Sequence, residues 1–187
     1  MELDRGKIVD LLNEKDPQVI SRLFDEAYCT KVENVGESVY LRGLIEISNI
    51  CRKNCLYCGI RSDNSAVVRY QLSNDDVLGA AKFALDAGYG SIVIQGGERQ
   101  DKAFVKNIKR LIKKIKRLSR ENPLGITLSL GEQPIEVYED WFDAGAHRYL
   151  LRIESSNEEL YNMIHPSGDL HSFNSRVQAL LNLKYTG

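Results

Sequence analysis

The sequence predicts an α/β fold, namely a partial (β/α) TIM-like barrel of about four strand–helix units preceded by N-terminal helices. From Val39 onward, short apolar runs of strand type alternate with longer amphipathic stretches of helix type, and this unit repeats four times. The run Ser91–Gln95 is apolar on consecutive residues, which is typical of a parallel strand covered on both faces. Successive strand–helix units favour right-handed crossovers and therefore a parallel sheet.

The expected elements follow one another in a regular order. The two N-terminal helices are expected over residues 6–13 and 17–28, the second with Pro17 in its first turn. The expected strands cover residues 39–47, 91–95, 125–130 and 147–153. The helices that alternate with them are expected over residues 73–86, 102–120, 134–142, 157–164 and 172–183. We therefore expect an N-terminal helical extension over residues 1–38 and one core domain over residues 39–187.

The length of the chain bears on how complete this barrel is. A closed barrel of eight units typically needs about 250 residues, whereas this chain has 187 and ends after a helix, where a fifth strand is expected. The sequence therefore predicts either an open partial barrel or a chain that is incomplete at its C-terminus.

Composition excludes several classes of protein. A net charge of −1 gives no general basic field, which argues against non-specific nucleic-acid binding. No apolar stretch approaches the roughly 18 residues of a membrane span, and Glu2 and Asp4 stand where a signal peptide carries positive charge. We expect a soluble, cytoplasmic protein with neither a nucleic-acid nor a membrane partner. The eight Lys and Arg residues from Lys106 to Arg120 form either a solvated outer helix face or a docking face for an acidic partner.

Three of the four cysteines lie within eight residues, in the order Cys51-x-x-x-Cys55-x-x-Cys58. This spacing suits metal ligation in a reducing compartment better than a disulfide framework. In a 4Fe-4S cluster three thiolates hold three irons, so that the fourth iron is open to a small molecule. An open iron predicts chemistry in addition to electron storage. The fourth cysteine, Cys29, is expected to be a buried or partly buried free thiol, not a ligand.

Polar and charged residues follow each expected strand. Because the carboxyl ends of the strands of such a barrel form its active site, we expect three carboxylates and one guanidinium beside the cysteines: Glu98, Glu132, Glu154 and Arg152. These groups suit a ligand that carries both an ammonium and a carboxylate, and S-adenosylmethionine is such a ligand. Gly96 and Gly97 lack a Cβ and would let the backbone approach its methionine end.

Other interpretations of these residues remain open. The cysteines could line one face of a buried helix, although Arg52, Lys53 and Gly59 make this a poor buried helix. They could also form a structural zinc site with a distant histidine as the fourth ligand, for which the candidates are His147, His165 and His171. The strand-end carboxylates and the arginine could instead be partners in structural salt bridges. The histidines otherwise receive no role.

The cysteine motif, with Tyr57 before its last cysteine, resembles the signature of the radical S-adenosylmethionine (radical SAM) superfamily. The sequences around it resemble the E-type maturases of FeFe-hydrogenase (HydE), which are relatives of biotin synthase and methylornithine synthase. The stretches that carry this closer resemblance are residues 42–49, 57–64, 127–132 and 149–157. The resemblance extends over nearly all of the chain from Val35 onward.

The resemblance implies a 4Fe-4S cluster on Cys51, Cys55 and Cys58, with S-adenosylmethionine on the fourth iron. Reductive cleavage of this cofactor would give methionine and a 5'-deoxyadenosyl radical that attacks a substrate inside the barrel. The resemblance also assigns cofactor contacts: Tyr57 near the adenine, Gly97 and Glu98 at the methionine amino group, and Glu132, Arg152 and Glu154 on the rest of the molecule.

The implied partners are a small-molecule or organometallic substrate, a reductant such as ferredoxin or flavodoxin, and other hydrogenase maturases. Biotin synthase-like and methylornithine synthase-like activities are the enzymatic alternatives, although Gly59-Ile60-Arg61 stands where biotin synthase carries Pro-Gln-Ser. A non-catalytic zinc or iron–sulfur module is the alternative from another class. Members of the family continue through two further strand–helix units, so the resemblance implies that this chain lacks the far wall of the substrate cavity.

Overall fold

The structure of the protein is a computed structural model that describes residues 4–186, so Glu2 and Gly187 lie outside the described residues. The chain divides into two compact units, one that extends to Tyr40 and one that starts at Leu41. Among the described residues, no helix combines the length and the apolar character needed to cross a membrane.

The first unit consists of helices α1 (Arg5–Asn13) and α2 (Pro17–Val35). The Asp16 side chain accepts a hydrogen bond at the start of α2, and Gly36, with a φ of 75°, ends it. Helix α2 is therefore longer than predicted, because no helix-ending residue occurs at residue 28. Neither helix has a buried residue. The prediction that Cys29 is at least partly buried is wrong, since this free thiol is exposed on α2.

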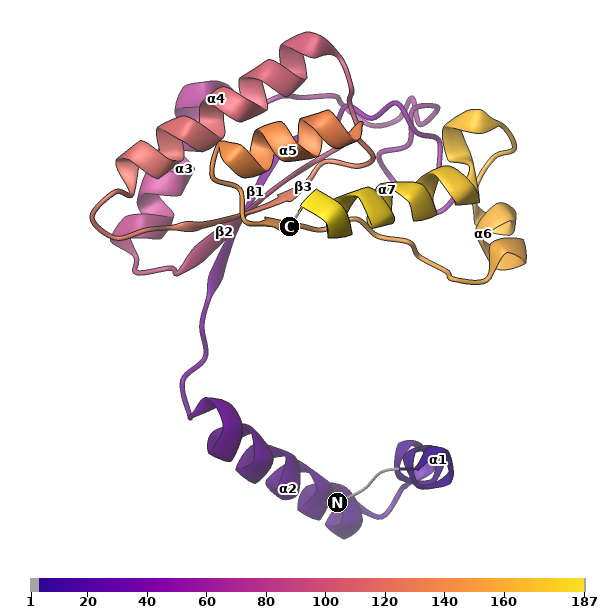
Figure 1. Ribbon diagram of the computed structural model, residues 1–187. Coiled ribbons are helices and arrows are strands. Elements are labelled where there is room, and N and C mark those ends of the chain that lie inside the picture. The colour runs from indigo at the N-terminus through magenta and orange to yellow at the C-terminus, as the bar shows by residue number, and fades with distance from the viewer. Residues whose placement is uncertain (1–3, 187) are drawn as a thin grey trace. The chain divides into compact units, whose positions relative to one another are not determined.

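The second unit is built on one four-stranded sheet in which all neighbouring strands are parallel and follow in sequence order (Figure 1). Its strands are β1 (Arg42–Ser48), β2 (Ser91–Gly96), β3 (Gly125–Ser129) and β4 (Arg148–Tyr149). Because the carboxyl ends of parallel strands lie at one edge, the loops after all four strands meet there. The predicted parallel sheet is confirmed.

Helices follow the strands as predicted. They are α3 (Asn74–Asp86), α4 (Lys102–Leu118), α5 (Ile135–Asp143), α6 (Glu158–Ile164) and α7 (Phe173–Thr186), with a short 3₁₀ turn η1 (Asp169–His171). Ser73 caps α3 in a capping box with Asp76, and the Asp101 side chain caps α4. Helix α6 stops before His165, which precedes Pro166.

The first and fourth strands are shorter than the sequence predicts. Strand β1 begins at Arg42 because β2 begins at its partner Ser91, so the three residues from Val39 have no neighbouring strand to pair with. In β4 only two residues form ladder pairs with β3, and Leu150 donates one further hydrogen bond to the Leu128 carbonyl at 2.7 Å. A run of apolar residues shows that a strand can form, but the length of its partner decides where it ends.

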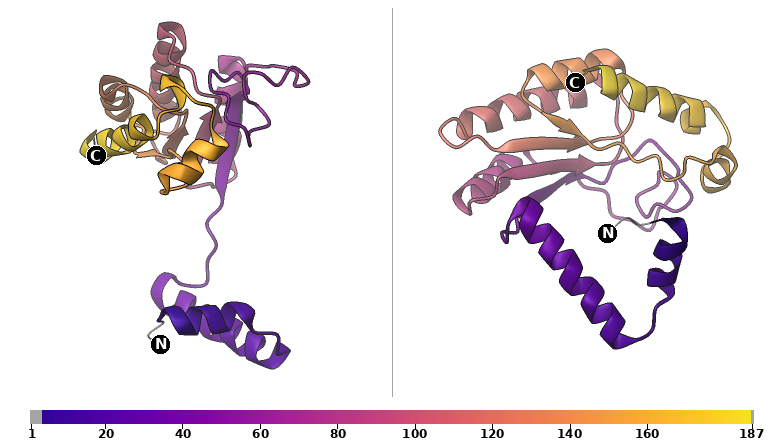
Figure 2. Two further views of the ribbon diagram at one scale, coloured as in Figure 1. Left: turned by 90° about the vertical axis from the view of Figure 1, so that its right-hand side faces the viewer. Right: turned by 60° about the horizontal axis from the view of Figure 1, so that its bottom comes forward.

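Helices α3, α4 and α5 lie along one face of the sheet, as the views in Figures 1 and 2 show. Apolar side chains of strands and helices form one core, whose largest fully buried members include Ile92, Ile94, Ile112, Ile126, Leu128 and Trp141. Burial of each such side chain contributes about 1.5–3 kcal/mol to folding. Leu44 and Leu150 are exposed at 59% and 43%, so apolar groups outside this core remain open. The helices packed on this face of the sheet hold the strands in place, and therefore also the loops at their carboxyl ends.

Candidate active site

The three motif cysteines lie in the loop that leaves β1, and each is partly exposed. Peptide N–H groups at alternate positions of this loop are bound: Arg52 to the Glu98 carbonyl (3.0 Å), Asn54 to His171 Nε2 (2.8 Å), Leu56 to the Ile164 carbonyl (3.0 Å) and Cys58 to the Cys55 carbonyl (3.0 Å). The loop has no regular secondary structure, so these bonds satisfy its backbone. They hold the cysteines against the end of β2 and against the segment after α6.

The end of β2 packs directly on the first cysteine. The Gly97 N–H donates to the Ser48 carbonyl at 3.0 Å, and the Glu98 N–H donates to Cys51 Sγ at 3.3 Å. A Cβ at Gly97 would lie 2.3 Å from the Ile50 carbonyl oxygen and 2.7 Å from Cys51 Cβ. Only glycine can occupy position 97 while the end of β2 lies this close to Ile50 and Cys51. The structure thus brings Gly97 and Glu98 to the cysteine loop.

The chemistry of the thiols fits a metal cluster. Burial raises the pKa of Cys51, against the lowering effect of hydrogen bonds from the backbone of Lys53 and Glu98. Burial also raises the pKa of Cys55, whose thiolate would feel the charges of Cys51 and Cys58. Neighbouring thiolates of this kind need a cation to be stable. Within residues 4–186, no group of three His, Cys, Asp or Glu side chains is close enough to hold a single metal ion. A cubane cluster does not need such a group, because each of its protein ligands binds a separate iron.

Glu98 presents an open acceptor beside these thiols. Its side chain is 5% exposed, and its Oε2 accepts a hydrogen bond from the Glu132 N–H at 2.8 Å. Its Oε1 is buried and has no hydrogen-bond partner among the described residues, while Lys53 Nζ lies 3.7 Å and Arg52 Nε 3.8 Å away. Burial raises the pKa of Glu98, and the charge of Lys53 opposes the rise. A buried carboxylate oxygen without a donor suits an incoming ammonium group.

Glu132 lies at the centre of a buried ion network. Its Oε2 is 3.0 Å from Lys53 Nζ and its Oε1 is 2.5 Å from Arg176 Nε. Burial acts to raise the pKa of Glu132, but the charges and hydrogen bonds of Arg176 and Lys53 outweigh it, so the pKa falls. Glu132 therefore forms salt bridges, as the structural alternative allows. Its partners are Lys53 of the cysteine loop and Arg176 of α7, and not Arg152.

The remaining predicted site residues lie at the rim. Tyr57 is 50% exposed, and its hydroxyl lies 3.4 Å from His165 Nε2. Arg152 is exposed and contributes its carbonyl, which accepts a hydrogen bond from Arg176. Glu154 is exposed with a φ of 64°, in the left-handed region. Within residues 4–186, neither the Arg152 guanidinium nor the Glu154 carboxylate forms a hydrogen bond or an ion pair.

Each of the three histidines has hydrogen-bond partners in the structure. His147 Nδ1 accepts the Ile126 N–H at 3.1 Å, at the other end of the strands. His165 Nδ1 lies 2.8 Å from the Tyr161 carbonyl, and His171 Nε2 accepts the Asn54 N–H. These contacts give the histidines structural roles and weaken the zinc interpretation.

A comparison of the sequence with protein families identifies its superfamily. The sequence profile of the Radical SAM superfamily matches residues 45–186, which is most of the chain. The chain belongs to the radical SAM superfamily. The predicted family is thereby confirmed, together with the cofactors that members use, a 4Fe-4S cluster and S-adenosylmethionine.

Relatives within the superfamily cover most or all of the chain. The [FeFe] hydrogenase maturase subunit HydE of Thermotoga maritima is 39% identical over 187 residues, which are 100% of this chain and 51% of that protein. Biotin synthase of Crocosphaera subtropica is 28% identical over 160 residues, which are 81% of this chain and 41% of that enzyme. The chain therefore spans about half the length of these relatives or less.

A solved structure confirms the fold. The crystal structure of methylornithine synthase (PylB) superposes with a TM-score of 0.83 at 24% identity, over 100% of this chain and 54% of that one. The predicted partial barrel of the radical SAM type is therefore correct.

Sequence reasoning missed two residues of the candidate site, Lys53 and Arg176. Both are charged, yet they are only 4% and 7% exposed. Lys53 Nζ also donates to the Leu170 carbonyl. The available signal was weak: Lys53 lies between two cysteines of the motif, whereas Arg176 resembles any polar helix residue. Burial of such side chains depends on partners that are distant in sequence.

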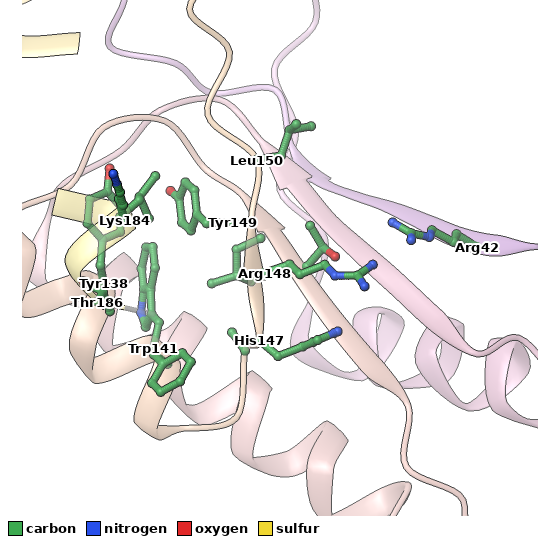
Figure 3. Close-up of a pocket in the computed structure, with 14 residues that line it drawn as sticks. Arg42, Tyr138, Trp141, His147, Arg148, Tyr149, Leu150, Lys184 and Thr186 are labelled. Atoms are coloured by element: carbon green, nitrogen blue, oxygen red, sulfur yellow. The ribbon is translucent and has the colours of Figure 1, made fainter. Parts of the chain in front are cut away.

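Next to the strands lies a cavity of about 470 Å³, lined in part by Arg42, Thr127, Arg148 and Leu150 (Figure 3). The Arg42 and Arg148 side chains point toward one another in this view. The Thr127 Oγ1 is buried without a hydrogen-bond partner among the described residues. Two guanidinium groups and a free hydroxyl suit a small anionic molecule.

Proposed function

We propose that this chain carries the cluster-binding and cofactor-binding part of an enzyme that reductively cleaves S-adenosylmethionine to methionine and a 5'-deoxyadenosyl radical, in maturation of the FeFe-hydrogenase H-cluster. The observation that carries the proposal is the packing of Gly97 and Glu98 onto Cys51. The 39% identity to the T. maritima maturase subunit supports the pathway. Biotin synthase-like and methylornithine synthase-like chemistries are the alternatives, with lower identities of 28% and 24% to relatives of those kinds.

In this proposal Cys51, Cys55 and Cys58 hold the cluster, which when bound supplies an electron and an open iron. Glu98 Oε1 accepts the cofactor ammonium, because it is a buried carboxylate oxygen to which no described residue donates a hydrogen bond. The backbone at Gly97 lies alongside the methionine end, since no side chain intervenes.

The rim residues complete the cofactor site. Arg152, Glu154 and Tyr57 are exposed and accessible to the ribose, carboxylate and adenine groups of a bound cofactor. Arg176, oriented by Glu132, adds a second cation for the carboxylate. Glu132 thus acts on the cofactor through the side chains that it orients.

We further propose that the substrate is a small or organometallic molecule that binds at the carboxyl ends of the strands, beside the cysteine loop. A cytoplasmic reductant such as ferredoxin or flavodoxin supplies the electron, and other hydrogenase maturases are the functional partners. A gene neighbourhood that contains those maturases would support this pathway over biotin or methylornithine synthesis.

Anaerobic reconstitution with iron and sulfide tests the proposed function. EPR of the dithionite-reduced protein is expected to show a 4Fe-4S signal that shifts when S-adenosylmethionine is added, because the cofactor binds the open iron. Tightly bound zinc without a cluster would contradict the proposal.

Cys55→Ala is expected to abolish formation of the 4Fe-4S cluster, because it removes one of three thiolates that hold separate irons. Cys29→Ala serves as the matched control and should retain full iron content, since Cys29 is exposed on α2. Iron and acid-labile sulfide are measured after reconstitution. Equal iron loss in the two variants would show that the ligand assignment is wrong.

A further inference from the structure

One side chain, Arg69, binds the backbone on both sides of the cysteine loop. Its guanidinium donates to five carbonyl groups: Nη1 to Asn49 (2.7 Å) and Ile60 (2.8 Å), and Nη2 to Arg61 (2.6 Å), Asn64 (3.2 Å) and Ser62 (3.5 Å). A guanidinium presents its donors in a rigid planar fork, so the acceptors around it are held in fixed positions.

The two bonds of Nη1 connect the ends of the motif. Asn49 lies two residues before Cys51, and Ile60 lies two residues after Cys58. A single nitrogen atom therefore joins the chain that enters the cysteine loop to the chain that leaves it. The remaining bonds of the guanidinium hold the turn that follows the last cysteine.

Arg69 is itself anchored independently of the cysteines. The Asn49 side chain donates from Nδ2 to the Val68 carbonyl and accepts the Tyr70 N–H at its Oδ1, each at 2.8 Å. The Ser48 hydroxyl donates to the Tyr70 carbonyl at 2.9 Å, and Ser48 forms an antiparallel bridge with Gln71. The residues on either side of Arg69 are thus fixed to the end of β1.

We propose that Arg69 is a positioning residue that clasps the cysteine loop and holds Cys51 and Cys58 at the separation needed for cluster binding. An arginine that binds one turn would only stabilise that turn; Arg69 differs because its contacts lie on both sides of the motif. This role rests on the proposed function, since it concerns the same cluster.

The test measures the rate of iron transfer from the reconstituted protein to a ferrous-iron chelator. Arg69→Ala is expected to release iron about tenfold faster than the unchanged protein, because several charge-assisted hydrogen bonds are lost. Millimolar guanidinium ion should restore slow release by filling the vacated site. Arg69→Lys should remain fast, since one ammonium cannot replace the planar fork. Circular dichroism of each variant checks that the fold persists.

Arg61→Ala is the matched control, because within the described part of the chain the Arg61 side chain donates only to the nearby Cys58 carbonyl, at 3.3 Å, and joins no distant segments. Its release rate should stay within about twofold of the unchanged protein. If Arg69→Ala retained iron normally, the proposed role of Arg69 would be wrong, whereas the proposed function of the chain would be unaffected. If Arg69→Ala released iron fast, guanidinium did not slow the release, and the melting temperature fell, Arg69 would have only a general structural role and the proposal would be wrong. An unchanged protein that takes up no cluster would overturn the proposed function itself.

Discussion

Gly97→Ala is expected to abolish cluster uptake. The added methyl group would lie 2.3 Å from the Ile50 carbonyl oxygen, 2.6 Å from the Ile50 carbonyl carbon and 2.7 Å from Cys51 Cβ. The first two are backbone atoms that cannot rotate away, so either the β2 end or the cysteine loop must move. Overpacking of this kind costs about 1–3 kcal/mol, and here the strain falls on a proposed ligand of the cluster.

Gly59→Ala provides the matched control, because Gly59 follows Cys58 directly and a Cβ there would meet no atom within 4 Å. Iron and sulfide are measured after anaerobic reconstitution of both variants, with circular dichroism to follow the fold. Gly59→Ala should reconstitute fully. If Gly97→Ala also acquired a complete cluster, the close packing of β2 on Cys51 would be irrelevant to cluster binding.

Lys53→Met is expected to lower the free energy of unfolding by about 3–5 kcal/mol, because removing one partner leaves buried charges uncompensated. Lys53 Nζ lies between Glu132 Oε2 at 3.0 Å and Glu98 Oε1 at 3.7 Å, and all three side chains are largely buried. For a chain of this size the melting temperature should fall by about 2–4 °C for each kcal/mol.

Lys82→Met is the comparison, since Lys82 pairs with Asp86 at 2.7 Å in a bridge whose side chains are 60% and 58% exposed. Such an exposed pair contributes about 0–1 kcal/mol. The double variant Lys53→Met, Glu98→Gln should recover part of the loss, because it also removes the buried charge that Lys53 faced, whereas Glu132 keeps its bond to Arg176. Equal melting temperatures for the Lys53 and Lys82 variants would show that the buried network adds no stability.

Much of the fold was predictable because its signals are local. The alternation of apolar runs and amphipathic stretches predicts the parallel sheet, and the cap at Ser73 predicts the start of α3. Strand lengths were less predictable, because the extent of β4 depends on its pairing with two residues of β3. The exposure of Cys29 was mispredicted because burial depends on what packs against α2, and sequence periodicity does not report that.

The residues of the candidate site were also predictable only in part, where a local pattern marks them. The cysteines and Glu98 follow strands at recognisable positions, so topology places them together. The contacts of Lys53 and Arg176 with Glu132 join residues 79 and 44 positions apart in the sequence. Such contacts follow from tertiary packing, and no local pattern reveals them.

Glu98 contacts the candidate cluster ligand through its backbone and faces the proposed cofactor through its side chain. In the proposed enzyme the two binding events are therefore one linked equilibrium. The factor by which the cluster tightens the cofactor must equal the factor by which the cofactor tightens the cluster. A change that misplaces Glu98 would therefore weaken both affinities together.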